Sequence, residues 1–103
     1  MLFKLYVPSS LSLSPEVLSK CVDAISRSPA GGCTTYMANG AYADISGEVH
    51  HECTDVIEVF VSGPCKRTWQ VVRACARMVL EQLEQKTVLA TVDSEPVFFK
   101  KGE

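Results

Sequence analysis

An apolar repeat with helical spacing in the second half of the chain constrains the fold most strongly. Between residues 65 and 85, the apolar positions lie 3, 4, 3, 1 and 3 residues apart: Trp69, Val72, Ala76, Val79, Leu80 and Leu83. This spacing places them on one face of a helix, with charged side chains at the other positions. The sequence therefore predicts an amphipathic helix over 65–85 whose apolar face packs against the rest of the chain.

A second, shorter helix is predicted to begin at Ser14. A serine hydroxyl at the cap, Pro15 at the first helical position and an acid in the first turn are typical of a helix start. Apolar residues then recur at helical spacing: Leu18, Cys21, Val22 and Ile25. Proline and glycine at 28–32 predict the turn that follows, and the apolar stripe is wide enough to seat this helix on a sheet.

The remaining segments have the composition and alternation of strands. The predicted strands cover residues 2–7, 33–43, 49–61 and 88–92, with 97–99 as an extra edge strand. Pro8 ends the first strand, and a short turn that contains glycine joins the second and third into a hairpin. Asn39-Gly40 predicts a bulge or a kink part-way along this hairpin.

The predicted order of strand, helix, strand, strand, helix, strand is the α+β, ferredoxin-like βαββαβ arrangement. Both helices then lie on one face of an antiparallel sheet. At 103 residues the chain has the length of one domain, so we expect a single domain over 1–103. The open sheet face and the exposed strand edges predict assembly into a symmetric oligomer.

Charge and cysteine content argue against several classes of protein. The formal net charge is -2 with both signs spread along the chain, so nucleic acid is not an expected partner. No apolar run approaches the ~20 residues of a membrane span, and we expect a cytoplasmic protein without membrane contact. The 5 cysteines include no C-x-x-C pair, which argues against a disulfide framework and a zinc ribbon. We expect Cys21 and Cys75 to be small core residues.

The run His50-His51-Glu52-Cys53 places four potential metal ligands side by side. Adjacent strand residues point to opposite faces, so only His51 with Cys53, or His50 with Glu52, can share one ion. Two ligands do not complete a zinc site, and no further spaced partner is present, so we expect no metal and interpret the run as a polar strand start. Phosphate-binding glycine loops and a serine-nucleophile constellation are also missing from the sequence.

Dispersed polar residues remain as candidates for a site: Tyr42, Glu48, Glu52, Glu58 and Glu84. Acidic residues mostly lie on protein surfaces, so a structural role explains any one of them singly. Glu58 stands in an otherwise apolar strand, and we expect it either at a sheet edge or paired across an oligomer interface. Only their combination indicates a functional site.

Several short motifs carry a family resemblance. They are Asn39-Gly40-Ala41-Tyr42 before the hairpin turn, Glu52 about ten positions later, the helix over 71–84, and Glu84-Gln85-Lys86-Thr87-Val88-Leu89 leading into the last strand. On these motifs the layout resembles that of the small phage-encoded S-adenosylmethionine lyases, formerly described as hydrolases. The resemblance covers most of the chain as an order of elements, and it implies a PII-like homo-trimer with sites between subunits.

In that family a tyrosine and two glutamates line the site, and the matching positions are Tyr42, Glu52 and Glu84, with Glu81 as an alternative to Glu84. The implied substrate is S-adenosylmethionine or an adenylated conjugate of it, in a counter-defence or signal-clearing role. Its carboxylate attacks its own γ-carbon, which expels 5′-methylthioadenosine and leaves homoserine lactone without cofactor, metal or protein nucleophile. Glu52 would hold the substrate ammonium, and Tyr42 would face the sulfonium.

Two other functions remain open. One is a non-enzymatic PII-like module that senses or sequesters a nucleotide at subunit clefts. The other is an interaction protein whose open sheet edge docks a host partner by strand addition. Turnover of S-adenosylmethionine would distinguish the lyase from the sensor, whereas a monomer that binds no nucleotide would indicate the interaction protein.

Overall fold

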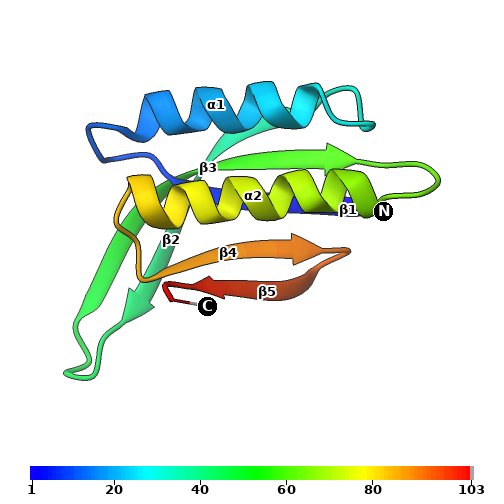
Figure 1. The fold of residues 1–103 in the computed structure, drawn as a ribbon. Coiled ribbons are helices and arrows are strands. Elements are labelled where there is room, and N and C mark those ends of the chain that lie inside the picture. Colours follow the sequence, from blue (N-terminus) through cyan, green and yellow to red (C-terminus); the bar gives the residue numbers. More distant parts are fainter. Residues whose placement is uncertain (103) are drawn as a thin grey trace.

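A five-stranded antiparallel sheet carries both helices on one face (Figure 1). The computed structural model describes residues 1–102, and its elements are β1 (Leu2–Pro8), α1 (Ser14–Ser26), β2 (Thr34–Ala43), β3 (Val49–Phe60), α2 (Lys66–Gln82), β4 (Thr87–Val92) and β5 (Glu95–Lys100). The strand order is β2-β3-β1-β4-β5, and every neighbouring pair is antiparallel. The predicted ferredoxin-like α+β fold is confirmed, and β5 extends the sheet beyond β4.

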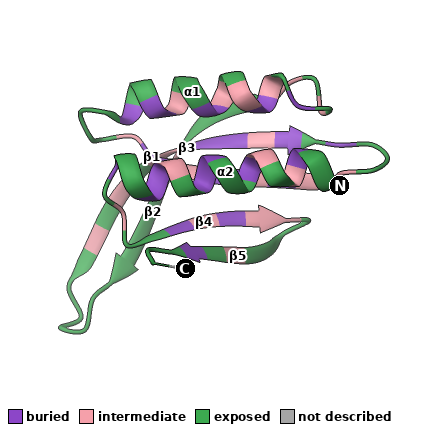
Figure 2. Cartoon of the chain, in the orientation of Figure 1, coloured by how far each residue is buried: buried purple, intermediate pink, exposed green. Residues whose placement is uncertain are grey.

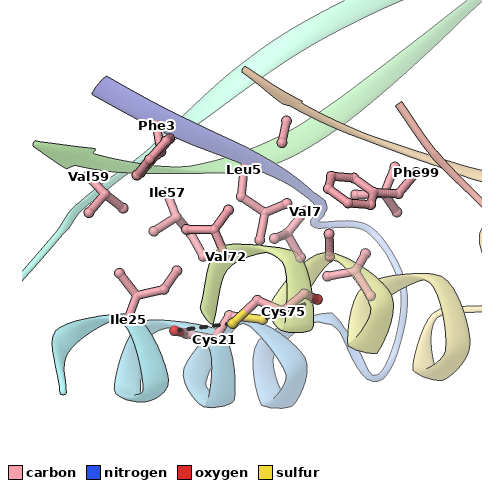
Figure 3. Packing of buried hydrophobic residues seen from close by; sticks show 14 of the residues in the cluster. Phe3, Leu5, Val7, Cys21, Ile25, Ile57, Val59, Val72, Cys75 and Phe99 are labelled. Atoms are coloured by element: carbon pink, nitrogen blue, oxygen red, sulfur yellow. Dashed lines mark hydrogen bonds between the residues drawn. The ribbon is translucent and has the colours of Figure 1, made fainter. Parts of the chain in front are cut away.

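The core lies between the sheet and the two helices (Figure 3). Alternate residues of β1 point toward the helices, so Phe3, Leu5 and Val7 are buried at its centre. Most of the predicted apolar face of α2 is buried against them, and Trp69 packs between the rings of Phe3 and Phe99, at centroid distances of 5.3 and 6.2 Å. The helical repeat therefore predicts the packing of α2 correctly. Neither described helix is long and apolar enough to span a membrane.

The start of α1 differs from its prediction. Ser14 is the first helical residue and is buried, and its Oγ accepts a hydrogen bond from the backbone N–H of Leu11 at 3.2 Å. The residue at the cap position is Leu13, whose side chain makes no capping bond. The predicted serine cap is wrong because the hydroxyl closes the preceding loop, whereas Pro15 does lie in the first turn.

The predicted hairpin of β2 and β3 forms without a bulge at Gly40, so the bulge that was predicted as one of two possibilities there is wrong. Gly40 pairs with Glu52 and Asn39 with Cys53 in one continuous register. The reversal occurs in the predicted turn that contains glycine, at Gly47, whose φ of 88° lies in the left-handed region that glycine adopts easily. An alternating pair of strands without an inserted residue keeps its side chains on the same faces throughout.

The far half of this hairpin projects beyond the sheet as an arm (Figure 1). The last pair between β1 and β3 joins Pro8 to Thr54, so in the described chain residues 39–43 and 49–53 pair in ladders only with each other. We call residues 39–53 the arm, and nearly all of it is exposed (Figure 2).

The two cysteines predicted for the core, Cys21 and Cys75, are buried where α1 meets α2. Each thiol points at the backbone carbonyl of the other residue, with sulfur–oxygen distances of 3.9 Å (Figure 3). The neighbouring Cys75 thiol and burial both raise the pKa of Cys21, which disfavours its thiolate. Both cysteines act as small core residues, as predicted.

Candidate functional site

The sheet face opposite the helices, here called the open face, is hollowed where the arm leaves the sheet. This hollow, here called the sheet hollow, has a volume of about 670 Å³. Its apolar side includes Tyr6, Leu89 and Phe98 from three strands, and its arm side includes Tyr42 and Glu52. An apolar wall with a few polar groups at one end is typical of a small-molecule site.

A second hollow lies between the arm and the end of α2, and we call it the helix-end hollow. Its volume is about 740 Å³, and its lining is more polar, with His50, Glu84 and Lys86 among its residues. Tyr42 and Glu52 line both hollows. These two residues therefore stand at the boundary between an apolar and a polar space.

The structure brings the three predicted site residues, Tyr42, Glu52 and Glu84, around the helix-end hollow. Glu84 reaches it because the chain leaves α2 through a left-handed residue, with φ of 51° at Glu84 itself. Glu81 lies within α2 on its exposed side and lines neither hollow. Of the two alternatives weighed for the third position, Glu84 is thus the one that lies near the other two residues.

Glu52 has open space around its carboxylate. It is half-buried and lies opposite Gly40 in the β2–β3 register, where no side chain fills the adjacent position. A Cβ atom built on Gly40 would approach only the backbone oxygen of Glu52, at 3.9 Å. Within residues 1–102, no hydrogen bond or salt bridge engages the Glu52 carboxylate, so it is available to a cationic ligand.

Tyr42 is more than half exposed, but its ring does not stand alone. It stacks on the imidazole of His50 with a centroid distance of 5.2 Å and an interplanar angle of 20°. His50 Nε2 lies 2.8 Å from Oδ2 of Asp44. Hydrogen bonds from the Ser46 side chain and from His50 hold the pKa of Asp44 down at about 2, so its carboxylate is charged at neutral pH.

The four potential ligands at 50–53 do not form a common cluster. His50 and Glu52 share the open face of the arm, whereas Cys53 points to the other face and its thiol donates to Oδ1 of Asn39 at 3.2 Å. Among the described residues, the cluster able to hold a cation is Asp44, Glu48 and His50, whose donor atoms lie within 4.8 Å of one another. Sequence reasoning missed Asp44 as a candidate, although it lies in the predicted turn between the second and third strands.

Glu58 does not lie at a sheet edge, and it has partners within its own chain. Its strand β3 is flanked by β1 and β2, and its carboxylate lies 3.8 Å from Lys4 Nζ and accepts a hydrogen bond from the Tyr36 hydroxyl at 3.2 Å. The expectation of a sheet-edge position is wrong because cross-strand neighbours on both sides supply partners for Glu58, whereas pairing across an oligomer interface stays a prediction.

Comparison with known proteins gives a clear result for the fold. No protein-family model matches the sequence, and no curated protein matches it. A structure of a phage SAM lyase in complex with S-methyl-5′-thioadenosine is similar with a TM-score of 0.63 and 18% identity, over 96% of this chain and 88% of that chain. A phage SAM lyase in the apo state is similar with a TM-score of 0.69 and 12% identity, over 99% and 90%. This chain therefore has the fold of these lyases over almost its whole length.

Proposed function

We propose that this protein is a lyase that acts on S-adenosylmethionine, or on an adenylated conjugate of it. The observation that carries the proposal is the meeting of Tyr42, Glu52 and Glu84 around one hollow. They meet in a chain with the fold of a phage SAM lyase whose complex contains S-methyl-5′-thioadenosine. That thioether is the leaving group of the proposed reaction.

The reaction is a ring closure within the substrate. A substrate carboxylate oxygen attacks the γ-carbon, the bond from that carbon to sulfur breaks, and the electron pair stays on sulfur. The sulfonium becomes a neutral thioether, 5′-methylthioadenosine, and the amino-acid part becomes homoserine lactone. Such a reaction needs chiefly a folded substrate conformer, and well-oriented intramolecular reactions gain up to about 7 to 11 kcal/mol from orientation.

The two hollows suggest how the substrate lies. The adenosine would occupy the sheet hollow against Tyr6, Leu89 and Phe98, because this wall is apolar and partly aromatic. The amino-acid end would then enter the polar helix-end hollow, with its ammonium facing Glu52 and Glu84. The sulfonium would lie between the hollows and near the ring of Tyr42, where a cation is attracted to the aromatic face.

We also propose a cytoplasmic homo-trimer whose subunits close over the open sheet face. Two observations support assembly. The edge strand β2 runs for 10 residues without a charged side chain, although charges usually protect free sheet edges. The open face also exposes Phe60 and Phe98, at 67% and 56%. Assembly would exclude water from the site, which favours a reaction that neutralises opposite charges. Light scattering of the purified protein measures the number of subunits.

The test is to incubate the purified protein with S-adenosylmethionine, and separately with the adenylated conjugate, and to follow 5′-methylthioadenosine by chromatography. Time-dependent release from either substrate, absent with heat-denatured protein, is the expected result. No release from either substrate contradicts the lyase. Binding of both without turnover would instead indicate the alternative, a nucleotide sensor or sponge.

A further inference from the structure

We propose, building on the lyase function above, that His50 is a positioning residue of the site. Held by Asp44, its imidazole supports the ring of Tyr42 and fixes the direction in which this ring faces the two hollows. Three features of the arm carry the proposal: an anchored carboxylate, a hydrogen bond to the imidazole, and a stacked pair of rings.

The anchor is Asp44 at the tip of the arm. Its Oδ1 accepts hydrogen bonds from the backbone N–H groups of Ser46 and Glu48, at 2.9 and 3.1 Å, and from the Ser46 hydroxyl at 2.5 Å. These bonds form an Asx-type turn that fixes the side chain. One oxygen is therefore held by the turn, while Oδ2 remains directed at Nε2 of His50, at 2.8 Å.

The imidazole of His50, fixed by Asp44, in turn contacts the ring of Tyr42. His50 is the direct partner of Tyr42 in the β2–β3 register, and their rings stack at 5.2 Å and 20°. In the described part of the chain, His50 supplies the aromatic ring that contacts Tyr42. Tyr42 is 57% exposed even with this contact. An exposed tyrosine without such a neighbour would sample several rotamers.

The position of the ring matters because Tyr42 borders both hollows. Ordering a side chain when the ligand binds weakens binding, and a small displacement of a positioning group slows a reaction that depends on orientation. Histidine suits this position because it donates to Asp44 through one nitrogen while presenting a flat face to Tyr42. Phenylalanine would keep only the flat face, and alanine would keep neither contact.

The first test is spectroscopic and needs no substrate. A ring stacked on Tyr42 shifts its aromatic proton signals, so we expect shifted Tyr42 signals in the wild type. His50→Ala should move them toward the values of a free tyrosine, His50→Phe should largely keep the shift, and the exposed control Val49→Ala should leave them unchanged. Tyr42 signals that are equal in the wild type and in His50→Ala would overturn the proposal.

The second test is kinetic, with 5′-methylthioadenosine release as the assay and EDTA present throughout. We expect His50→Ala to lower kcat/KM by about 10- to 100-fold, because a misplacement of about 1 Å can slow an oriented reaction by as much as about 100-fold. His50→Phe should restore most of the loss, and Val49→Ala should match the wild type. Equal losses in His50→Ala and His50→Phe would overturn the role of the ring. Loss of wild-type activity in EDTA would overturn it in favour of a metal at Asp44, Glu48 and His50.

Failure of the two proposals can be told apart. A wild type that releases no 5′-methylthioadenosine, but whose Tyr42 signals respond to His50→Ala as described, refutes the lyase and leaves the ring support intact. Turnover in the wild type together with a His50→Ala variant of equal activity refutes the positioning role alone.

Discussion

Replacing Glu52 by glutamine tests the proposed ammonium contact with almost no change in shape. The carboxylate is half-buried, has no partner within residues 1–102, and lies beside the space left by Gly40. A hydrogen bond with a charged group contributes about 1.5 to 3 kcal/mol, and the bond from the ammonium to a neutral amide oxygen lies near the lower end of this range, so we expect the variant to lose about 1 to 1.5 kcal/mol. This corresponds to a fall in kcat/KM of roughly 5- to 13-fold.

Initial rates over a range of S-adenosylmethionine concentrations measure this loss. Losing an ammonium contact that is made equally in the bound substrate and in the transition state raises KM and leaves kcat unchanged, so the effect should appear mainly in KM. Glu81→Gln makes the same chemical change at a site that lines neither hollow and serves as the control. An unchanged kcat/KM in Glu52→Gln, or an equal fall in the control, would refute the reasoning.

Four further predictions follow from the same structure. Gly40→Leu should weaken the binding of 5′-methylthioadenosine, measured by calorimetry, by at least about tenfold, which is about 1.4 kcal/mol. Thermal stability should not fall, because the Cβ of the new side chain would meet only a backbone oxygen at 3.9 Å. An affinity equal to that of the wild type would contradict the sheet hollow as the adenosine site. Glu84→Gln should lower kcat/KM more than Glu81→Gln, and the reverse order would reassign the third position. Ile57→Ala, at a fully buried position, should lower the free energy of unfolding in urea by about 2 to 5 kcal/mol, and a loss below about 1 kcal/mol would contradict the packing. The charged Asp44 carboxylate should contribute its full stability to the arm above its ordinary pKa of 3.8, and this contribution should be lost as the pH falls through about 2. The amide signals of the arm tip measure this loss, and signals that are unchanged down to that pH would contradict the prediction.

The fold was largely predictable because its main signals are local. The repeat along α2 and the alternation in the strands reflect one buried face per element, which is what periodicity reports. The errors arose at single residues whose sequence is compatible with more than one local structure. Ser14 bonds backward to Leu11 instead of capping α1, and Gly40 pairs with Glu52 in a continuous register without the bulge. Composition does not distinguish such choices.

The site was predictable only in part. Tyr42 and Glu52 share a face because strand pairing places even-numbered residues of the hairpin together. Glu84 joins them from a distant helix end, through a left-handed residue that no pattern marks. The sequence alone offered it as one of several dispersed polar residues, and the family resemblance grouped it with Tyr42 and Glu52. The stacking of His50 on Tyr42 was missed because it depends on the register, which the expected bulge would have shifted.

The origin of the oxygen atoms in the product tests the lyase most directly. The protein is incubated with S-adenosylmethionine in water enriched in oxygen-18, and the amino-acid product is analysed by mass spectrometry. Ring closure predicts homoserine lactone without label, released in equal amount to 5′-methylthioadenosine. Later hydrolysis of the lactone at its carbonyl would place label in the carboxylate alone. Label in the hydroxyl group of homoserine would show attack by water at the γ-carbon and would contradict the intramolecular displacement.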